Sequence, residues 1–389
     1  MGGLMGDAMQ AMWAAAGPNR LGAARRLLRA VLASGEVDAM LVPLRHPAGD
    51  AITPALVKDP EMLELADPFA PVLPLNGARL VSMLTQKTPR PRVAAVLRSC
   101  EIRALIELAK LQQASLDGMV IVGVECTGTY EVADFARVAR GEHPEAFTVR
   151  AACQMCEHPT PSGAHITLLQ IGLGKEEGLC LASDDLWGER LGLDDNTASQ
   201  RPSGDDGLKG DDGPGPYHTL SADALTLRED ELGRLIGERA ATRDRMLADM
   251  VEHTATPEGL ADVFSTCIRC HNCMTNCPIC YCRTCFFKGE VFDHEPLQYV
   301  QWAGRKGAAR MPADTALFHL TRMNHMSTSC VGCGLCSSAC PVGIPVGAIF
   351  RAVASRTQRL FGYEAGRSLD EAPPVRTFQV DELRGLGEG

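Results

Sequence analysis

Apolar residues form short continuous runs in the first half of the chain, with a periodic pattern between two of them. The runs at 92–97 and 119–124 predict strands buried on both faces, because such strands do not alternate between apolar and polar positions. A similar run at 39–44 predicts another buried strand. Over 101–114, apolar residues recur every three or four positions, which predicts an amphipathic helix. Strand, helix and strand in this order predict an α/β N-terminal domain with a parallel β-α-β core.

Three other stretches predict local structure. The segment 8–16 predicts a short helix that stops at Gly17-Pro18. The proline-rich segment 47–74 predicts loops and short helices around the domain. Thr226-Leu-Arg-Glu229 matches a capping box, so a charged helix is expected to begin there and to run to about residue 252.

Two cysteines follow the ends of the two predicted parallel strands. Cys100 and Cys126 are therefore expected at the sheet edge where open α/β sheets bind their ligands. Cys153-Gln-Met-Cys156 supplies two more thiols, and four thiolates suit a [4Fe–4S] cluster. Two alternatives remain open. Cys100 and Cys126 are small residues of a buried core, or Cys153 and Cys156 are a redox dithiol or half of a zinc site.

The second half of the chain carries the run C-x2-C-x2-C-x3-C-P twice. The eight cysteines of the two runs are Cys267, Cys270, Cys273 and Cys277, then Cys330, Cys333, Cys336 and Cys340. In two-cluster ferredoxins the fourth cysteine of each run binds the other cluster. We therefore expect Cys340 to complete the first [4Fe–4S] site and Cys277 the second. Structural zinc sites usually use two separated pairs, so this doubled run disfavours zinc.

Three further cysteines, Cys280, Cys282 and Cys285, follow the first run closely. They are either packing residues beside the first cluster or most of the ligands of an additional cluster, with a fourth ligand from Cys180 or from another chain. The packing interpretation is preferred, because a C-x-C step is uncommon in the loops that hold cubane clusters. Nearby histidines are expected to form hydrogen bonds or to lie at the surface instead of binding iron: His271, His319 and His325.

Charge and cysteine content exclude several classes of protein. The 389 residues carry a formal net charge of −10, which argues against nucleic acid as the main partner. Sixteen cysteines without a secretory signal favour a reducing cytoplasm over a secreted disulfide scaffold. No apolar stretch is long enough for a membrane span. Neither a Walker-type loop nor an H-E-x-x-H motif occurs, so hydrolase chemistry has no support.

These patterns divide the chain into five parts. The expected parts are an α/β domain over 1–192, a flexible linker over 193–220, a connecting helix over 221–257, a two-cluster ferredoxin domain over 258–350 and a C-terminal tail over 351–389. The spacer between the two cysteine runs has helical patterns over 286–329, so the ferredoxin domain is expected to be mainly α-helical.

Several stretches resemble one family. Ser99-Cys-Glu-Ile-Arg-Ala-Leu-Ile-Glu-Leu-Ala-Lys-Leu111, Val124-Glu-Cys-Thr-Gly-Thr-Tyr130 and the C-x2-C pair resemble the beta subunits of coenzyme F(420)-linked hydrogenases and formate dehydrogenases. The resemblance implies an α/β domain that binds FAD and one [4Fe–4S] cluster. It also implies hydride exchange between the flavin and a deazaflavin coenzyme. By position, it implies the cluster ligands Cys100, Cys126, Cys153 and Cys156. The second half resembles the helical ferredoxin domains of heterodisulfide reductase and succinate dehydrogenase iron–sulfur subunits.

Two functions compete on this basis. In the first, the chain is an iron–sulfur subunit of a hydrogenase or formate dehydrogenase type of oxidoreductase, and it passes electrons between a catalytic partner subunit, its clusters and a flavin. In the second, it is a flavin-free adaptor that only transfers electrons, for example in a heterodisulfide-reductase-like complex. A third interpretation, a zinc-stapled scaffold, predicts a colourless protein.

Overall fold

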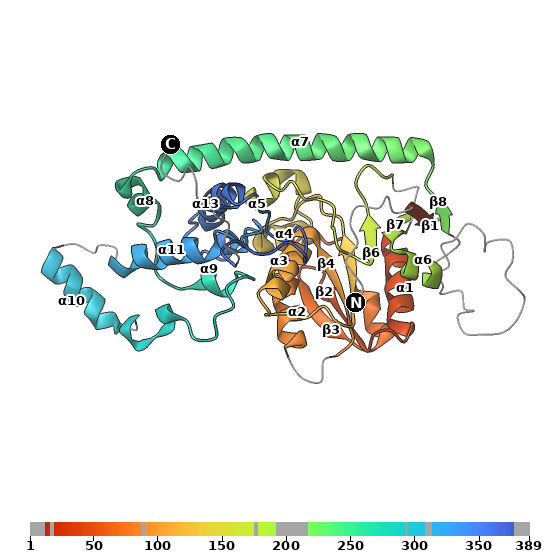
Figure 1. The fold of residues 1–389 in the computed structure, drawn as a ribbon, viewed down its shortest axis with the longest axis horizontal. Coiled ribbons are helices and arrows are strands. Elements are labelled where there is room, and N and C mark those ends of the chain that lie inside the picture. The colour runs from red at the N-terminus through yellow and green to blue at the C-terminus, as the bar shows by residue number, and fades with distance from the viewer. Residues whose placement is uncertain are drawn as a thin grey trace, which may run out of the picture. The chain divides into compact units, whose positions relative to one another are not determined.

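The computed structural model describes residues 12–15, 19–86, 91–174, 178–191, 217–292, 294–307 and 313–376. The chain divides into two compact units (Figure 1). The sheet unit comprises Met1–Thr242 with Gly366–Asp370, and the helical unit comprises Arg243–Ala365 with Glu371–Gly389. Most of the predicted linker, residues 193–216, lies outside the described residues.

The sheet unit is built on a mixed sheet of eight strands in the order β3-β2-β4-β5-β6-β7-β1-β8. The strands are β1 Met12–Ala15, β2 Ala39–Arg45, β3 Ile52–Val57, β4 Val93–Arg98, β5 Met119–Val124, β6 Ile166–Leu169, β7 Leu179–Ser183 and β8 Tyr217–Thr219. Strands β2, β4, β5 and β6 are parallel to one another, and the remaining pairs are antiparallel.

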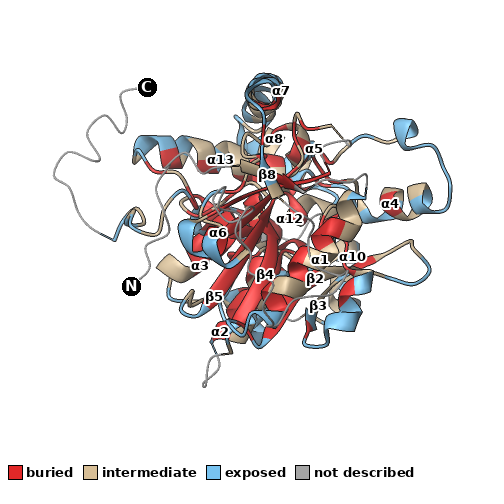
Figure 2. Cartoon of the chain, turned by 90° about the vertical axis from the view of Figure 1, so that its right-hand side faces the viewer, coloured by how far each residue is buried: buried red, intermediate tan, exposed pale blue. Residues whose placement is uncertain are grey.

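Helices cover both faces of this sheet. The helices of the unit are α1 Arg20–Ala33, α2 Gly77–Thr85, α3 Ser99–Lys110, α4 Val132–Ala139, α5 Ala151–Gln154, α6 Asp185–Leu191 and the first part of α7 Ala222–His253, with 3-10 turns at Pro60–Leu65 and Pro144–Ala146. Leu27, Leu28 and Val31 of α1 share one apolar cluster with alternate residues of the central strands. Helices α2 and α3 pack against β4 and β5. Every residue of β4 and β5 is buried, which explains their continuous apolar runs (Figure 2).

Glu101 fixes the start of α3 at the end of β4. Its carboxylate accepts the backbone N–H of Arg98 at 2.8 Å and that of Gly77, the first residue of α2, at 2.7 Å. One buried carboxylate therefore caps α3 and ties α2 to it, which holds the carboxyl end of β4 in a fixed position.

Three predictions for the sheet unit differ from the structure. Residues 12–15 of the predicted helix over 8–16 form β1, which pairs with β7 and β8, so sheet pairing overrides the local helix preference. The segment 47–74 contains β3, an edge strand that pairs with β2. Proline is tolerated on an edge strand, which explains how Pro54 lies within it. The predicted linker over 193–220 also ends too late, because 217–219 form β8.

Helix α7 begins four residues before the predicted capping box. Ser221 Oγ accepts the N–H of Ala224 at 3.1 Å, whereas the Thr226 hydroxyl donates to the carbonyl of Ala222 within the helix. The division between the two units falls inside this helix, after Thr242.

The first part of α7 is anchored to the sheet unit by a buried ion pair. Arg228 Nη2 lies 2.5 Å from Glu125 Oε1, and Arg228 Nη1 lies 3.1 Å from Glu125 Oε2. Glu125 Oε2 also accepts the N–H groups of Gln170 and Ile171 at 2.7 and 2.9 Å. The pair is thus bidentate and fully hydrogen-bonded, which is the arrangement that offsets the cost of burying two charges.

Among the described residues, the helical unit holds the last third of α7 and six shorter helices. They are α8 Pro257–Val263, α9 Asn272–Thr275, α10 Pro296–Lys306, α11 Ala313–Met326, α12 Leu335–Ser338 and α13 Val346–Leu360, with 3-10 turns at Phe286–Lys288 and Glu290–Phe292. The spacer between the cysteine runs is helical, as its pattern predicted. The predicted tail over 351–389 begins too early, because α13 runs to Leu360 and Gly366 donates its N–H to Glu107 Oε1 of α3 at 2.8 Å.

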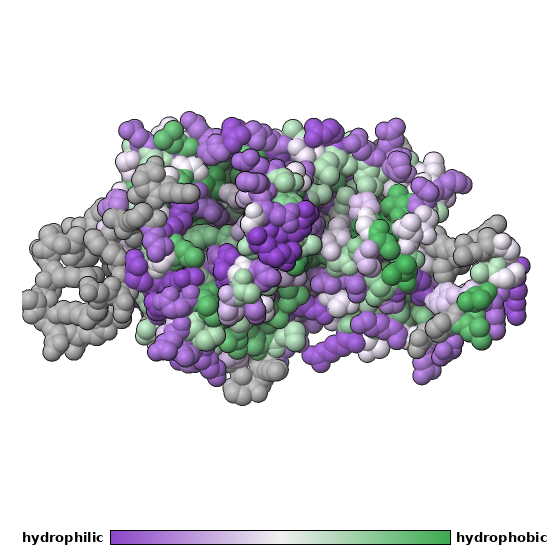
Figure 3. Space-filling view, turned by 180° about the vertical axis from the view of Figure 1, so that it is seen from behind, coloured by the Kyte–Doolittle hydropathy of each residue, from purple (hydrophilic) through white to green (hydrophobic). Residues whose placement is uncertain are grey.

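Polar and apolar residues are mixed over the surface that Figure 3 shows. Isolated apolar residues on a protein surface are ordinary. Among the described residues, no helix combines the length and the apolar character that a membrane crossing requires.

The ion pair on α7 gives a stability prediction. Arg228→Met leaves Glu125 buried without its cation, so we expect the sheet unit to lose about 3–5 kcal/mol of stability. Hydrogen exchange of the β5 and β6 amides in a urea series measures this loss. Arg234→Met on the same helix breaks exposed pairs with Glu231 and Glu238, which are screened by solvent, so it should reduce the stability far less. Equal losses in the two variants would contradict the anchoring role.

Candidate iron–sulfur centres

The parallel pairing of β4 and β5 places Cys100 and Cys126 at the same sheet edge. Arg98, the last residue of β4, is in register with Val124, the last residue of β5, and each cysteine follows two residues later. Cys100 is then the second residue of α3, and Cys126 is held by its N–H bond to the carbonyl of Pro159 at 2.9 Å. The strand register alone therefore brings these two thiols to neighbouring positions.

Cys153 and Cys156 lie in a single turn at the end of α5. The N–H of Cys156 donates to the carbonyl of Cys153 at 3.2 Å. The Cys153 thiol is 3.4 Å from Thr129 Oγ1 and 3.7 Å from Arg150 Nη2. Arg150 is itself buried and donates through Nε to Thr129 Oγ1 at 2.8 Å. This network fixes the Cys153 side chain next to a buried positive charge.

Electrostatic interactions show that three of the four thiols lie close together. Burial raises the pKa of Cys126. The positive charge of Arg98 lowers this pKa, whereas the thiols of Cys153 and Cys156 raise it. Burial also opposes ionisation of Cys153, but the charge of Arg150 and hydrogen bonds from Thr129 and Arg150 outweigh it and lower the pKa of that thiol. The site therefore contains the positive charge that a set of thiolates needs.

A second arginine of α7 holds the loops that carry these cysteines. Arg239 Nη2 donates to the carbonyl of Thr127 at 2.5 Å. Its Nη1 lies 3.4 Å from the carbonyls of Cys126 and of Cys156. Arg239 and Arg228 are eleven residues apart, which is about three helical turns, so both project from the same face of α7. Sequence reasoning missed Arg239, although this spacing was a signal for it.

The two cysteine runs of the helical unit adopt the same backbone conformation. In the first run, Arg269 and His271 have positive φ values of 56° and 59°. In the second run, the equivalent residues are Gly332 and Gly334, with φ values of 70° and 72°. A left-handed conformation is easy for glycine and costs other residues about 1–2 kcal/mol. Its recurrence at matching positions indicates that the loop function, and not the local sequence, requires this geometry.

The electrostatic neighbours of Cys273 and of Cys336 come from both cysteine runs. Burial raises the pKa of Cys273 to about 11, and its neighbouring thiols include Cys267, Cys270 and Cys340. Burial raises the pKa of Cys336 well above its usual value, and its neighbouring thiols are Cys277, Cys333 and Cys330. Each group of four thiols thus contains three cysteines of one run and the fourth cysteine of the other.

Hydrogen-bond donors surround the first group of thiols. The N–H of Arg269 lies 3.4 Å from Cys267 Sγ, and the N–H of Ile344 lies 3.3 Å from Cys340 Sγ. His319 is buried, places Nε2 3.3 Å from Cys267 Sγ and stacks on Phe264 with ring centroids 3.8 Å apart. Burial lowers the pKa of His319 to about 4, so its imidazole is neutral at pH 7. His319 is therefore a hydrogen-bonding neighbour of a predicted ligand, in line with the sequence expectation.

The donor chemistry fits iron–sulfur clusters. All sixteen cysteines are free thiols, and the predicted ligand sets combine thiols with backbone N–H groups and buried arginines. Thiolate ligation and hydrogen bonds to sulfur are what such clusters use. Among the described residues, no group of three or more Cys, His, Asp or Glu side chains forms a site for a single metal ion.

The three extra cysteines occupy different environments. Cys280 is partly buried, burial raises its pKa to about 11, and its neighbouring thiols are Cys277, Cys282 and Cys285. Cys285 Sγ lies 3.6 Å from the Met274 sulfur, and Cys282 is exposed. Cys180 is fully buried in β7, in an apolar cluster of the sheet unit.

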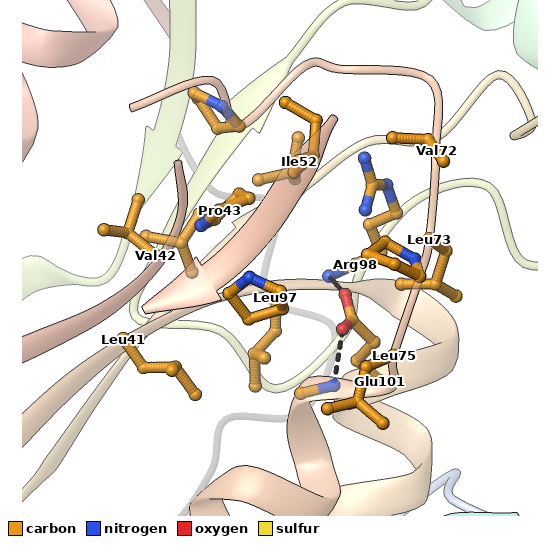
Figure 4. A pocket seen from close by; sticks show the side chains of 16 residues that line it. Leu41, Val42, Pro43, Ile52, Val72, Leu73, Leu75, Leu97, Arg98 and Glu101 are labelled. Atoms are coloured by element: carbon orange, nitrogen blue, oxygen red, sulfur yellow. Dashed lines mark hydrogen bonds between the residues drawn. The ribbon is translucent and has the colours of Figure 1, made fainter. Parts of the chain in front are cut away.

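A small pocket lies beside the middle of β2 and residues of β3, at the carboxyl ends of β4 and β5. Apolar residues line most of it, and Arg98 and Glu101 supply its polar groups (Figure 4).

Comparison with known proteins now adds to this geometry. Residues 263–344 match the family described as the 4Fe-4S dicluster domain. The chain is 25% identical to the F(420)-dependent formate dehydrogenase subunit beta of Methanocaldococcus jannaschii, over 91% of this chain and 93% of the relative. It is also 25% identical to the F(420)-dependent formate dehydrogenase 1 subunit beta of Methanococcus maripaludis, over 91% of this chain and 92% of the relative.

A solved structure is also similar. It is the F(420)-reducing [NiFe] hydrogenase complex from Methanosarcina barkeri, with 13% identity and a TM-score of 0.46, covering 66% of this chain and 96% of the matched chain. The comparisons confirm the resemblance to the beta subunits of F(420)-linked formate dehydrogenases and hydrogenases. They also confirm a [4Fe–4S] module in the second half of the chain.

The three extra cysteines give a direct prediction. Replacing Cys280, Cys282 and Cys285 together by alanine should leave the iron and sulfide content per chain unchanged, because the predicted ligand sets are complete without them. Cys330→Ser serves as the positive control and should lose iron. A loss of about four iron atoms from the triple variant, with both ferredoxin signals intact, would establish an additional cluster.

Proposed function

We propose that this chain is the iron–sulfur electron-transfer subunit of a multi-subunit oxidoreductase of the formate dehydrogenase or hydrogenase type. The observation that carries the proposal is the pair of interleaved four-thiol groups in the helical unit, on a chain similar over nine-tenths of its length to formate dehydrogenase beta subunits. Clusters bound there would supply one-electron chemistry. The chain's own residues position them, exclude water and set their potentials.

The ferredoxin clusters are assigned crossed ligands in this proposal. Cys267, Cys270, Cys273 and Cys340 hold the first cluster, and Cys330, Cys333, Cys336 and Cys277 hold the second. The spacing of the runs, the matching left-handed residues and the grouping of the thiols support this assignment.

A single substitution tests the crossing. Cys277→Ser should remove or alter the paramagnetic signal of the cluster bound by the second run and leave that of the first run in place. Cys282→Ser, an exposed thiol five residues away, is the matched control and should change neither signal. Loss of the first-run signal alone would show that each run binds its own cluster.

A third [4Fe–4S] cluster is assigned to the edge of the sheet. Its proposed ligands are Cys100, Cys126, Cys153 and Cys156. Strand register supports the pair from β4 and β5, and mutual electrostatic interaction supports the three later cysteines. The buried guanidinium groups of Arg98 and Arg150 would offset the negative charge of the ligands.

Iron counting on the full chain tests the function and the third site together. After anaerobic reconstitution, we expect about twelve iron and twelve sulfide per chain, as three cubanes require. Cys126→Ser should lower the iron count by about four. Cys180→Ala, a core cysteine of the same sheet unit, is the control and should retain it. An iron content that stays near eight in both the wild type and Cys126→Ser would remove the third cluster. A colourless, iron-free protein would remove the function.

A flavin-free chain is the alternative proposal, and no residue is assigned to FAD or to a deazaflavin here. The alternative is an electron-transfer adaptor, for example for a heterodisulfide-reductase-like complex. Flavin absorbance in the supernatant of the acid-precipitated holoprotein would decide for the flavin-binding form.

The proposed partner is the catalytic subunit of such an oxidoreductase. Relatives of this chain are named as beta subunits of F(420)-dependent formate dehydrogenases. A reducing compartment such as the cytoplasm is proposed, because all sixteen cysteines are free and most are assigned to clusters.

A further inference from the structure

Arg322 of α11 lies among the cysteines of the ferredoxin module. Only 3% of its surface is exposed. Its Nη1 donates to Cys273 Sγ at 3.1 Å, and its Nη2 donates to the carbonyl of the same cysteine at 3.1 Å. The guanidinium group thus forms a two-pronged contact with one proposed ligand of the first cluster.

The same guanidinium group also interacts electrostatically with thiols of the second set. The thiols with which it interacts electrostatically are Cys273, Cys277, Cys336 and Cys280, in order of decreasing strength. Cys273 belongs to the first proposed cluster site, whereas Cys277 and Cys336 belong to the second. Arg322 is therefore a single buried cation that both sites share.

Among the described residues, no carboxylate is paired with Arg322, and its Nε has no hydrogen-bond partner. Two aromatic rings hold it instead: its Cζ lies 4.8 Å from the centre of the Phe350 ring and 5.6 Å from that of Phe318. Cation–π contacts of this kind fix a guanidinium group without neutralising its charge.

A buried cation is costly unless negative charge compensates it. Arginine keeps its proton in proteins, so it cannot escape this cost by becoming neutral. Thiolate-ligated clusters are anionic, and each electron that enters adds one negative charge. Net charge and hydrogen bonds to sulfur are among the factors that set cluster potentials.

We propose that Arg322 is a positioning residue that serves as a common counter-charge for the two ferredoxin clusters and raises the reduction potential of both. This inference rests on the two-cluster assignment of the proposed function. When one electron passes between the clusters, one is oxidised and the other is reduced by the same electron, and no atom is transferred. The charge of Arg322 interacts with the added electron whichever of the two clusters carries it. A change in this charge should therefore shift both reduction potentials in the same direction.

The contacts differ between the two sites. The first cluster receives both the charge of Arg322 and a hydrogen bond to Cys273 Sγ. For the second cluster, the structure gives only a charge interaction with Cys277 and Cys336. Loss of the guanidinium group should therefore lower the first potential more than the second.

Redox titration of the full-length holoprotein, followed by paramagnetic resonance, tests the proposal. In Arg322→Met, which removes the charge and keeps an unbranched side chain, both midpoint potentials should become more negative, and that of the Cys273 cluster should move further. In Arg322→Lys, which keeps the charge and loses the planar fork, the second cluster should stay near its wild-type potential while the first falls. Arg356→Met removes an exposed charge from α13 and should shift neither cluster.

Each other outcome overturns the inference. If only the cluster of Cys273 shifts in Arg322→Met, the arginine serves one site and is not shared. If neither shifts, its role is structural. If Arg322→Met fails to retain iron, the titration of Arg322→Lys tests the proposal instead. Because lysine keeps the positive charge, an equal fall in the potentials of both clusters in this variant would show that the charge does not set them. A wild-type protein that shows fewer than two ferredoxin clusters would instead remove the proposed function on which the inference depends.

Discussion

Burial of cysteine sulfur beside positive charge is the constraint on which both units depend. A thiolate removed from water needs a compensating cation or several hydrogen-bond donors. In the sheet unit, Arg150 lowers the pKa of Cys153 despite its burial, and Arg98 acts in the same direction on Cys126. In the helical unit, Arg322 donates directly to Cys273. The arginines are as buried as the thiols, so neither group would be stable there without the other.

This constraint explains why distant elements converge on the cysteines. The sheet supplies the edge and the register, but the buried arginine that fixes the cysteine loops comes from α7, more than eighty residues later. Arg239 donates to backbone carbonyls there, so it holds the shape of the loops and leaves the thiols free to bind. The Arg228–Glu125 pair anchors the same helix one residue before Cys126. The ion pair and the loop contacts therefore stabilise the same end of β5.

The cysteines could be predicted from the sequence because spacing is a local property. The two C-x2-C-x2-C-x3-C-P runs, the two strand ends and the C-x2-C pair predict all twelve proposed ligands. Their charged partners could not be predicted in this way. Arg322 lies 45 residues after Cys277 on an amphipathic helix, where a buried arginine has no local signature. Local patterns failed for 12–15 and 217–219 for a related reason, since both become strands only through pairing with distant strands.

The helical spacer between the two cysteine runs stabilises the backbone conformation of the first cysteine loop. The second run satisfies its two left-handed positions with Gly332 and Gly334, at little conformational cost. The first run has Arg269 and His271 there, which costs about 1–2 kcal/mol at each. In return, Arg269 forms an ion pair with Asp314 at 2.7 Å and bonds Tyr299 at 3.1 Å, and the His271 ring packs on Phe318. All three partners belong to α10 and α11, so the strained residues attach the loop to the spacer. A spacer of strands and turns would lack these attachment points, and the first run would then need glycines like those of the second.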